Sequence, residues 1–149
     1  MSPRRPGRRT PAGKREESAI LADYGERYRA AVAEPRLAVE RSVFGTDYGI
    51  TSYTTPSHAD RLVDLLALGP TVRVLDLGTG SGWPGLYLAS RSGCELVGCD
   101  LPLAGLASAR RRAALDGLTG RAGFIQSSAR RLPFRHRSFD AIVSADVMC

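Results

Sequence analysis

The sequence predicts an α/β fold with a parallel sheet, and two observations carry this prediction. From about residue 72 onward, short apolar runs of strand length alternate with stretches of helical length. Because these runs are apolar throughout rather than alternately polar, we expect strands that are buried on both faces. Closely spaced glycines follow the first run, as they do where such folds turn sharply from a strand into a helix.

Length and composition exclude several classes of protein. The chain has 149 residues, 43% hydrophobic and 24% charged, which fits about one soluble globular domain. No apolar run reaches the roughly 18 residues of a membrane-spanning helix, and no signal-peptide core follows the N-terminus. The three cysteines cannot all pair and the two histidines lie far apart, so no disulfide framework and no metal site are predicted. We expect a protein of the reducing cytoplasm that does not contact membranes.

Residues 1–15 are predicted to be a disordered basic leader. They hold six of the 21 basic residues and no acid, so the rest of the chain carries no net charge, against +6 for the whole. Such a leader can contact RNA or DNA phosphates, but a solvated segment rich in Pro, Gly and Arg is the simpler interpretation. Its prolines also disfavour an amphipathic targeting helix. Nucleic acid is therefore not expected as a partner.

Residues 16–69 are predicted to form a helical lid segment. Apolar residues recur at helical spacing over residues 16–33 and, after a proline, over residues 37–44. A third helix begins at the hydroxyl cap of Thr55, which a proline follows, and it ends at Gly69. The residues that this third helix is predicted to bury are Leu62, Val63, Leu65 and Leu66.

Residues 70–149 are predicted to form a partial sheet of about four strands. The predicted strands cover residues 72–76, 96–100, 123–126 and 139–147. A helix follows the first strand to about Ser90, and another follows the second strand from Pro102 onward. Strands and helices in this order favour parallel pairing with right-handed crossovers.

The carboxyl ends of three predicted strands carry the candidate site, because ligands of open α/β sheets bind there. Glycines in the turn 78–80 let a ligand approach the backbone, and Asp76 can accept hydrogen bonds from the loop amides. Asp100 is placed to take both hydrogens of a ribose diol, although it can also serve as a helix cap. Ser128 offers a hydroxyl to an adenine edge. The candidate cofactor-binding residues are Asp76, Gly78, Thr79, Gly80, Asp100, Leu101, Ser128 and Ala129.

The segment Gly80–Gly85 also matches the dinucleotide-binding fingerprint, so an NAD-dependent oxidoreductase is an alternative. Two features oppose it. Asp76 would lie close to a pyrophosphate, and Trp83 and Pro84 would crowd the helix start that has to receive it. A cofactor with an amino-acid end suits Asp76 better. This favours S-adenosylmethionine, with its ribose at Asp100 and its methionine end at the glycine turn.

The segment Val74–Gly82 resembles the first motif of the Rossmann-like (class I) S-adenosylmethionine-dependent methyltransferases. Residues 96–100 resemble the second motif of this family, residues 127–134 resemble the third, and residues 138–146 are similar to its fourth strand. The resemblance runs from about Thr71 to the end of the chain and is closest to the small-molecule branch. It implies an S-adenosylmethionine cofactor and methyl transfer to a small-molecule acceptor.

The same resemblance implies that leading helices form part of a lid, from which Tyr48, Tyr53 and Thr54 approach the methionine end of the cofactor. The sequence departs from the family pattern in two places. Ser128 stands where the third motif usually has an acid, and the chain stops at Cys149, as the fourth of seven family strands finishes. We therefore expect a fragment with the cofactor half and little activity of its own; the alternative is a nonenzymatic or degenerate binding module. An apolar edge on the fourth strand predicts self-association.

Other residues receive structural roles or none. Trp83 is interpreted as a wall beside the glycine turn, and the run of residues 110–112 as the solvated face of a helix. Cys99 is expected to be buried and inert. Asp146 either orients a substrate or caps a turn, and no catalytic residue is assigned.

Overall fold

The computed structural model describes residues 12–145 and Val147, with side chains from Glu17 onward. Its strands form one parallel sheet in the order β3-β2-β1-β4. The strands are β1 (Arg73–Leu77), β2 (Glu95–Asp100), β3 (Ala122–Gln126) and β4 (Ala141–Val143). The predicted α/β fold with a parallel sheet is confirmed. Residues 1–11 of the predicted leader, and Asp146, lie outside the described residues.

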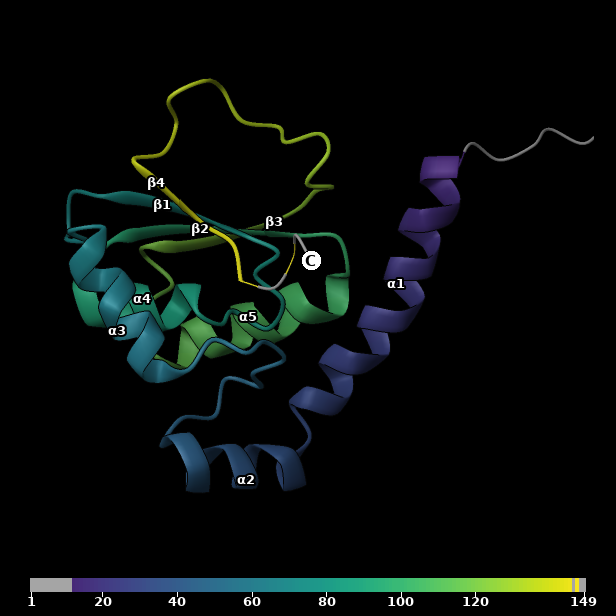
Figure 1. Cartoon of the computed structure of the whole chain (residues 1–149), viewed down its shortest axis with the longest axis horizontal. Helices are drawn as coiled ribbons and strands as arrows, with labels where there is room; N and C mark the ends of the chain where they lie inside the picture. Colours follow the sequence, from purple (N-terminus) through teal and green to yellow (C-terminus); the bar gives the residue numbers. More distant parts are fainter. Residues whose placement is uncertain (1–11, 146, 148–149) are drawn as a thin grey trace, which may run out of the picture.

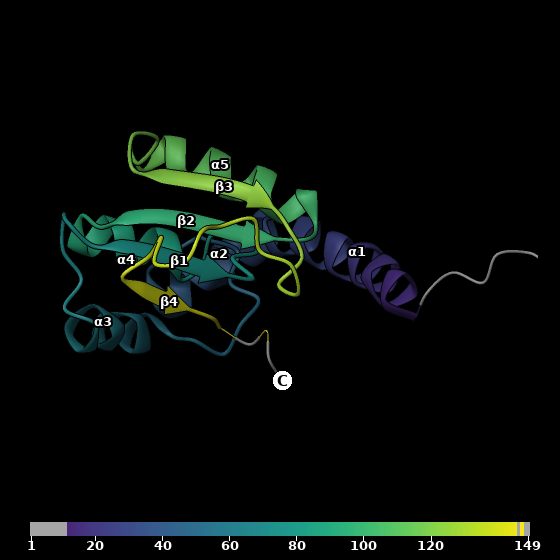
Figure 2. The same ribbon diagram turned by 90° about the horizontal axis from the view of Figure 1, so that it is seen from above.

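Helices cover one face of the sheet (Figure 1). The helices α4 (Gly85–Ser92) and α5 (Leu103–Leu115) follow β1 and β2, and α3 (Pro56–Leu65) packs against α4. Val74, Leu96 and Val143 belong to the main core, which lies between these helices and the sheet. Seen from above, α5 lies on the β3 side of the sheet and α3 on the β4 side (Figure 2).

The other face of the sheet is covered by the loop of residues 127–140 instead of by helices (Figure 1). Phe134 and Phe139 of this loop pack edge to face, with ring centroids 4.9 Å apart, against a small cluster around Leu75. Ile142 is 62% exposed, so the prediction that the fourth strand is buried on both faces is wrong. This strand is also shorter than predicted, because Phe139 packs within the loop. Self-association through its edge stays a prediction.

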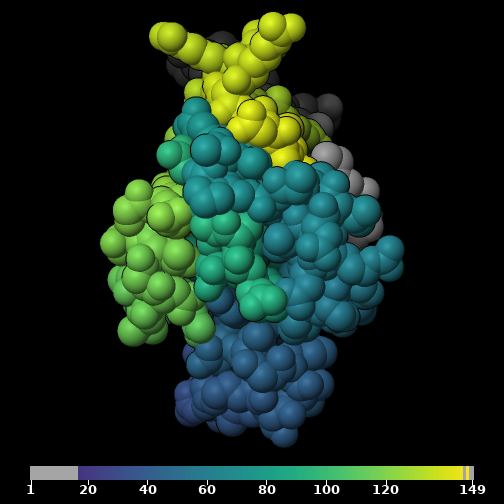
Figure 3. Space-filling view, turned by 90° about the vertical axis from the view of Figure 1, so that its left-hand side faces the viewer, coloured from purple at the N-terminus to yellow at the C-terminus, as the bar shows by residue number. Residues whose placement is uncertain are grey.

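Two helices precede the sheet. The first, α1 (Ala12–Ala31), begins four residues inside the segment that the sequence predicts to be a disordered leader. The second, α2 (Glu34–Phe44), takes Pro35 into its first turn, where a proline sacrifices no hydrogen bond and can begin a helix. In Figure 3, α2 forms the bottom of the molecule, and β4 with the end of the preceding loop forms the top.

The start of α3 follows the prediction, but its buried residues do not. Thr55 caps the helix: its hydroxyl accepts the His58 N–H at 3.3 Å, and the His58 ring accepts the Thr55 N–H in return. Leu65 is 72% exposed and Leu66 is also exposed, which contradicts their predicted burial. The chain turns directly after the helix, so that Leu68 enters the core in their place.

The predicted lid segment, residues 16–69, shares one core with the sheet. Tyr48 and Ile50, from the loop after α2, belong to the same buried cluster as Val74 of β1. The lid segment is therefore anchored on the sheet-covering helices through this loop. None of the helices in the described part of the chain has the length and apolar character needed to cross a membrane.

Candidate functional site

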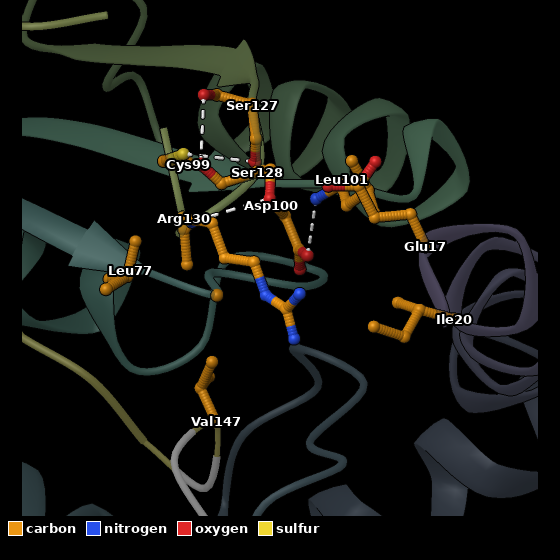
Figure 4. Close-up of a pocket in the computed structure, with 12 residues that line it drawn as sticks. Glu17, Ile20, Leu77, Cys99, Asp100, Leu101, Ser127, Ser128, Arg130 and Val147 are labelled. Carbon is orange, nitrogen blue, oxygen red and sulfur yellow. Dashed lines mark hydrogen bonds between the residues drawn. The ribbon is translucent and has the colours of Figure 1, made fainter. Parts of the chain in front are cut away.

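The carboxyl ends of β1, β2 and β3 border a pocket of about 260 Å³. In the close-up, Ile20 of α1 and Leu77 of β1 lie on opposite sides, with Asp100 between them (Figure 4). Five of the eight predicted cofactor-binding residues line this pocket, namely Gly78, Asp100, Leu101, Ser128 and Ala129. The other three, Asp76, Thr79 and Gly80, belong to the turn behind it.

Asp100 ends β2 and accepts three hydrogen bonds. Its Oδ1 accepts the N–H of Leu101 at 2.7 Å, and its Oδ2 accepts the N–H of Gly80 at 2.7 Å. The third donor is the hydroxyl of Tyr28, 3.0 Å from Oδ2. Burial raises the pKa of Asp100, while these three donors favour the ionised form and oppose the shift. The carboxylate is thus held in one orientation at the edge of the pocket.

Tyr28 of α1 is the residue of this site that the sequence does not reveal. Its ring is buried over the glycine turn, and burial together with the charge of Asp100 raises the pKa of its phenol. The hydroxyl therefore stays protonated and donates. Tyr28 is separated from Asp100 by 72 positions, and its only sequence signal is a place in a helical apolar pattern.

The glycine turn fits closely against the neighbouring strand. Gly78 (φ +77°) and Gly80 (φ +51°) have left-handed backbones that favour glycine. The N–H groups of Gly78 and Thr79 both donate to the carbonyl oxygen of Cys99, at 2.7 and 3.1 Å. A Cβ on Gly80 would lie 2.8 Å from the ring of Tyr28. The turn consequently has backbone, rather than side chains, where it borders β2 and α1.

Asp76 of β1 lies behind the turn and is almost completely buried. Its Oδ2 accepts the hydroxyl of Thr79 at 2.7 Å and the N–H of Gly85 at 3.2 Å. Its Oδ1 is buried and has no partner among the described residues. Burial raises the pKa of Asp76 to about 7. These contacts agree with a role for Asp76 in holding the shape of the turn, and the carboxylate does not line the pocket.

The start of α4 is closed to a diphosphate. A helix start binds phosphate through free backbone N–H groups, but the Gly85 N–H is donated to Asp76 and the Leu86 N–H to the carbonyl of Gly82. Pro84, also buried here, has no N–H at all. The geometry therefore opposes the dinucleotide interpretation of the glycines.

The third strand end completes the pocket. The Ser127 N–H donates to the carbonyl oxygen of Asp100 at 3.0 Å, which holds this loop against the end of β2. Ser128 follows, half-buried on the pocket wall, and its hydroxyl accepts the Arg130 N–H at 3.4 Å. Ala129 leaves an open surface beside it. Ser128 and Ala129 thus form an uncharged part of the wall, while Arg130 next to them extends its guanidinium into the pocket (Figure 4).

Tyr48, Tyr53 and Thr54 do not line this pocket. Tyr48 packs its ring against Trp83 and Tyr87, with centroids 5.5 and 6.3 Å away. Trp83 in turn donates its indole N–H to the carbonyl of Thr54 at 2.9 Å, while Tyr53 is 90% exposed. Aromatic packing thus fixes the loop on α4, and the approach of this loop to the methionine end of the cofactor stays a prediction.

The predicted solvated face at residues 110–112 is wrong for Arg112. Its guanidinium lies 4.3 Å from the centroid of the Tyr48 ring and forms ion pairs with Asp47 and Asp116. These contacts raise the pKa of Arg112 against the opposing effect of burial. Arg112 therefore fastens the loop after α2 to the end of α5, and its role is structural.

The remaining ionisable groups offer no second centre within the described residues. Across residues 17–145 and Val147, no three His, Cys, Asp or Glu side chains are arranged to hold a metal ion. Cys99 is a free, buried thiol whose pKa is raised chiefly by burial. A thiol of this kind is a poor nucleophile.

The comparisons with known proteins agree on one family. A family model described as "Methyltransferase domain" matches residues 74–149. Demethylmenaquinone methyltransferase from Thermus thermophilus is 43% identical over 86 residues, which cover 57% of this chain and 38% of the relative. The chain thus spans about two fifths of the length of this curated relative.

Two solved structures are similar to the fold. A SAM-dependent methyltransferase from Thiobacillus denitrificans, in complex with S-adenosyl-L-homocysteine, has a TM-score of 0.58 and 27% identity, and the match covers 76% of this chain and 43% of that one. Geranyl diphosphate C-methyltransferase from Streptomyces coelicolor A3(2) has a TM-score of 0.65 with 20% identity, over 93% of this chain and 55% of that one. The second similarity shows the fold alone.

Proposed function

This chain belongs to the family of methyltransferase domains, and from that premise we propose that it binds S-adenosylmethionine for methyl transfer to a small-molecule acceptor. The observation that carries the proposal is the carboxylate of Asp100, fixed by two backbone amides at the edge of a pocket. A fixed carboxylate of this kind suits a vicinal diol, which donates two hydrogen bonds side by side.

We assign the nucleoside to the strand ends that line the pocket. Asp100 holds the ribose diol, and Leu101, Ser128 and Ala129 border the adenine. Ser128 supplies a neutral hydrogen bond, which is weaker than a carboxylate would give. The fit rests on the position of Asp100 on the pocket wall, next to Leu101, Ser128 and Ala129.

The methionine end is assigned to the glycine turn. Gly78 and Val147 both line the pocket. The Val147 side chain lies against the face of Gly78 that has no Cβ, so in this proposal the methionine end takes the space that Val147 occupies in this structure. In this proposal Asp76 and Thr79 act from behind, because their mutual hydrogen bond and the bond from Gly85 hold the turn in place. Asp76 is therefore a supporting residue of the cofactor site.

Methyl transfer requires little from the protein except that it positions the cofactor and the acceptor. Bound S-adenosylmethionine supplies a sulfonium-activated methyl group that is already electrophilic. The residues described here orient the nucleoside and turn the methionine end toward the open side of the pocket, so that an acceptor can approach in line. No side chain is assigned as a general base, and Asp146 lies outside the described residues.

The acceptor class and the compartment are parts of the same proposal. The chain carries no net charge beyond its first fifteen residues, which supports a small-molecule acceptor over nucleic acid. Cys94 and Cys99 are free, buried thiols, as is usual for proteins of a reducing cytoplasm.

Calorimetry with the full chain tests the cofactor. We expect a saturable signal with S-adenosylmethionine and with S-adenosyl-L-homocysteine, and none with NAD at the same concentrations. A signal with NAD alone would instead favour an oxidoreductase. Incubation with methyl-labelled S-adenosylmethionine and small-molecule acceptors then tests transfer. Binding without transfer would identify a binding module.

A further inference from the structure

The contact between Tyr28 and Asp100 leaves the carboxylate short of acceptor positions. Each carboxylate oxygen offers two acceptor positions. Those of Oδ2 are filled by the Gly80 N–H and the Tyr28 hydroxyl, while Oδ1 has accepted only the Leu101 N–H. One position therefore stays open, whereas a ribose diol donates two hydrogen bonds.

The ring of Tyr28 sits in a seat formed by two glycines. A Cβ on Gly80 or on Gly105 would come within 2.8 Å of the ring. Gly105 lies in the first turns of α5 and Gly80 lies in the glycine turn, so the ring fills the space between these two elements. Close packing of the Tyr28 ring against these two glycines therefore directs its hydroxyl toward Asp100.

Apart from its packing along α5, α1 buries few large side chains. Of its described side chains, Ile20, Leu21 and Tyr24 are exposed, whereas Tyr28 and Ala31 are buried. Few buried contacts mean a low free energy of local opening. Nearer its N-terminus, the same face of the helix reaches the pocket through Glu17 and Ile20 (Figure 4), so a displacement of α1 widens the pocket.

We propose that Tyr28 is a gate residue of the cofactor site: its hydroxyl and one ribose hydroxyl compete for the same acceptor position on Asp100. This inference rests on the proposed function. The docking of α1 through Tyr28 and the binding of a nucleoside through both ribose hydroxyls are then mutually exclusive at Oδ2. The cofactor binds only after the phenol has released Asp100. The apparent affinity is therefore the intrinsic affinity multiplied by the fraction of molecules in the released state.

The test is Tyr28→Phe in the full chain, with Tyr24→Phe as the matched control on the same helix. Phenylalanine keeps the ring in its glycine seat and removes only the hydroxyl. We expect S-adenosyl-L-homocysteine to bind Tyr28→Phe about three- to tenfold more tightly than the wild type by calorimetry, and Tyr24→Phe to match the wild type. Equal or weaker binding by Tyr28→Phe would overturn the inference.

Ribose analogues separate competition from a merely structural effect. One of the two ribose hydroxyls competes with the Tyr28 hydroxyl for Asp100. An S-adenosyl-L-homocysteine analogue that lacks this ribose hydroxyl is expected to bind Tyr28→Phe and the wild type with about equal affinity. We therefore expect one of the two monodeoxy analogues, 2′ or 3′, to lose the gain. A gain retained by both analogues would overturn the inference.

Hydrogen exchange of the wild type gives a test that needs no variant. Saturating S-adenosyl-L-homocysteine is expected to speed the exchange of backbone amides in residues 17–31, because α1 loses its contact with Asp100. Slower or unchanged exchange would overturn the gate while leaving the proposed function intact. If neither the wild type nor Tyr28→Phe binds the nucleoside, the proposed function fails, and the gate fails with it.

Discussion

Asp76, the next-to-last residue of β1, and Asp100, the last residue of β2, lie on the same face of the sheet, yet their surroundings differ. The register pairs Asp76 with Gly98, so Asp100 lies two residues further along its strand. Asp76 therefore lies behind the turn that leads into α4, where Thr79 and Gly85 donate to it. Asp100 extends past that turn to the pocket. The same residue type at two depths thus supports the turn at Asp76 and, in the proposed function, binds the ribose at Asp100.

The largest expected effect concerns Asp76, which supports the glycine turn. Burial raises the pKa of Asp76 to about 7, above the ordinary value near 4, so the folded state binds a proton more tightly than the unfolded state. The free energy of unfolding then falls as pH rises from about 4 to about 7, by up to about 4 kcal/mol. Asp76→Asn, which keeps an acceptor oxygen, is expected to abolish this fall.

Urea denaturation at several pH values measures this effect. The variant is expected to be more stable than the wild type at pH 8 and similar to it near pH 4. If the free energy of unfolding of Asp76→Asn depends on pH as that of the wild type does, the dependence belongs to other groups. Asp76 would then lie in a better solvated site.

Gly85→Ala tests how closely the protein packs around the side chain of Asp76. A Cβ at this position would lie 2.5 Å from Oδ2 of Asp76, so the turn or the start of α4 has to shift. We expect a loss of about 1–3 kcal/mol in the free energy of unfolding. Gly123→Ala, whose added Cβ meets nothing within 4 Å, serves as the control in the same thermal or urea measurement. Equal stability of both variants would contradict close packing around Asp76.

Asp100→Ala tests the other half of the comparison. We expect S-adenosyl-L-homocysteine to bind more weakly by about 1–3 kcal/mol, because the ribose hydroxyls lose a charged acceptor. Asp76→Asn is expected to stay within threefold of the wild type in the same calorimetric titration, and Asp64→Ala, on the exposed side of α3, to be unchanged. A larger loss in Asp76→Asn than in Asp100→Ala would reverse the two roles.

Ser128→Ala carries the smallest expected effect. Loss of one neutral hydrogen bond at a half-buried position corresponds to about 0.5–1 kcal/mol, a two- to fivefold weaker affinity for the nucleoside. Ser90→Ala, an exposed serine of α4, is the control. A loss as large as that of Asp100→Ala would mean that the adenine edge, and not the ribose, dominates recognition.

The parts of the site that are local in sequence were predictable. The glycines of the turn follow the first apolar run within a few residues, and each carboxylate lies at the end of its own predicted run, so the chemistry of both follows from local spacing. Asp100 and Gly78 accordingly lie at one pocket, as the strand pattern predicted.

The parts that depend on distant contacts were not predictable. Tyr28 meets Asp100 across 72 positions, and Arg112 meets Asp47 across 65. Helical periodicity places Tyr28 on an apolar face but does not identify what that face meets. The same limit explains Leu65, which has the hydrophobic character of a core residue but is exposed because the chain turns after α3 and buries Leu68.

A crystal structure of the full chain with S-adenosyl-L-homocysteine is the most direct measurement. We expect both ribose hydroxyls within hydrogen-bond distance of the Asp100 carboxylate, the adenine beside Ser128, and the amino-acid end along the turn from Gly78 to Gly80. A nucleoside bound away from Asp100, or a glycine turn wrapped around a diphosphate when NAD is soaked in its place, would contradict the account.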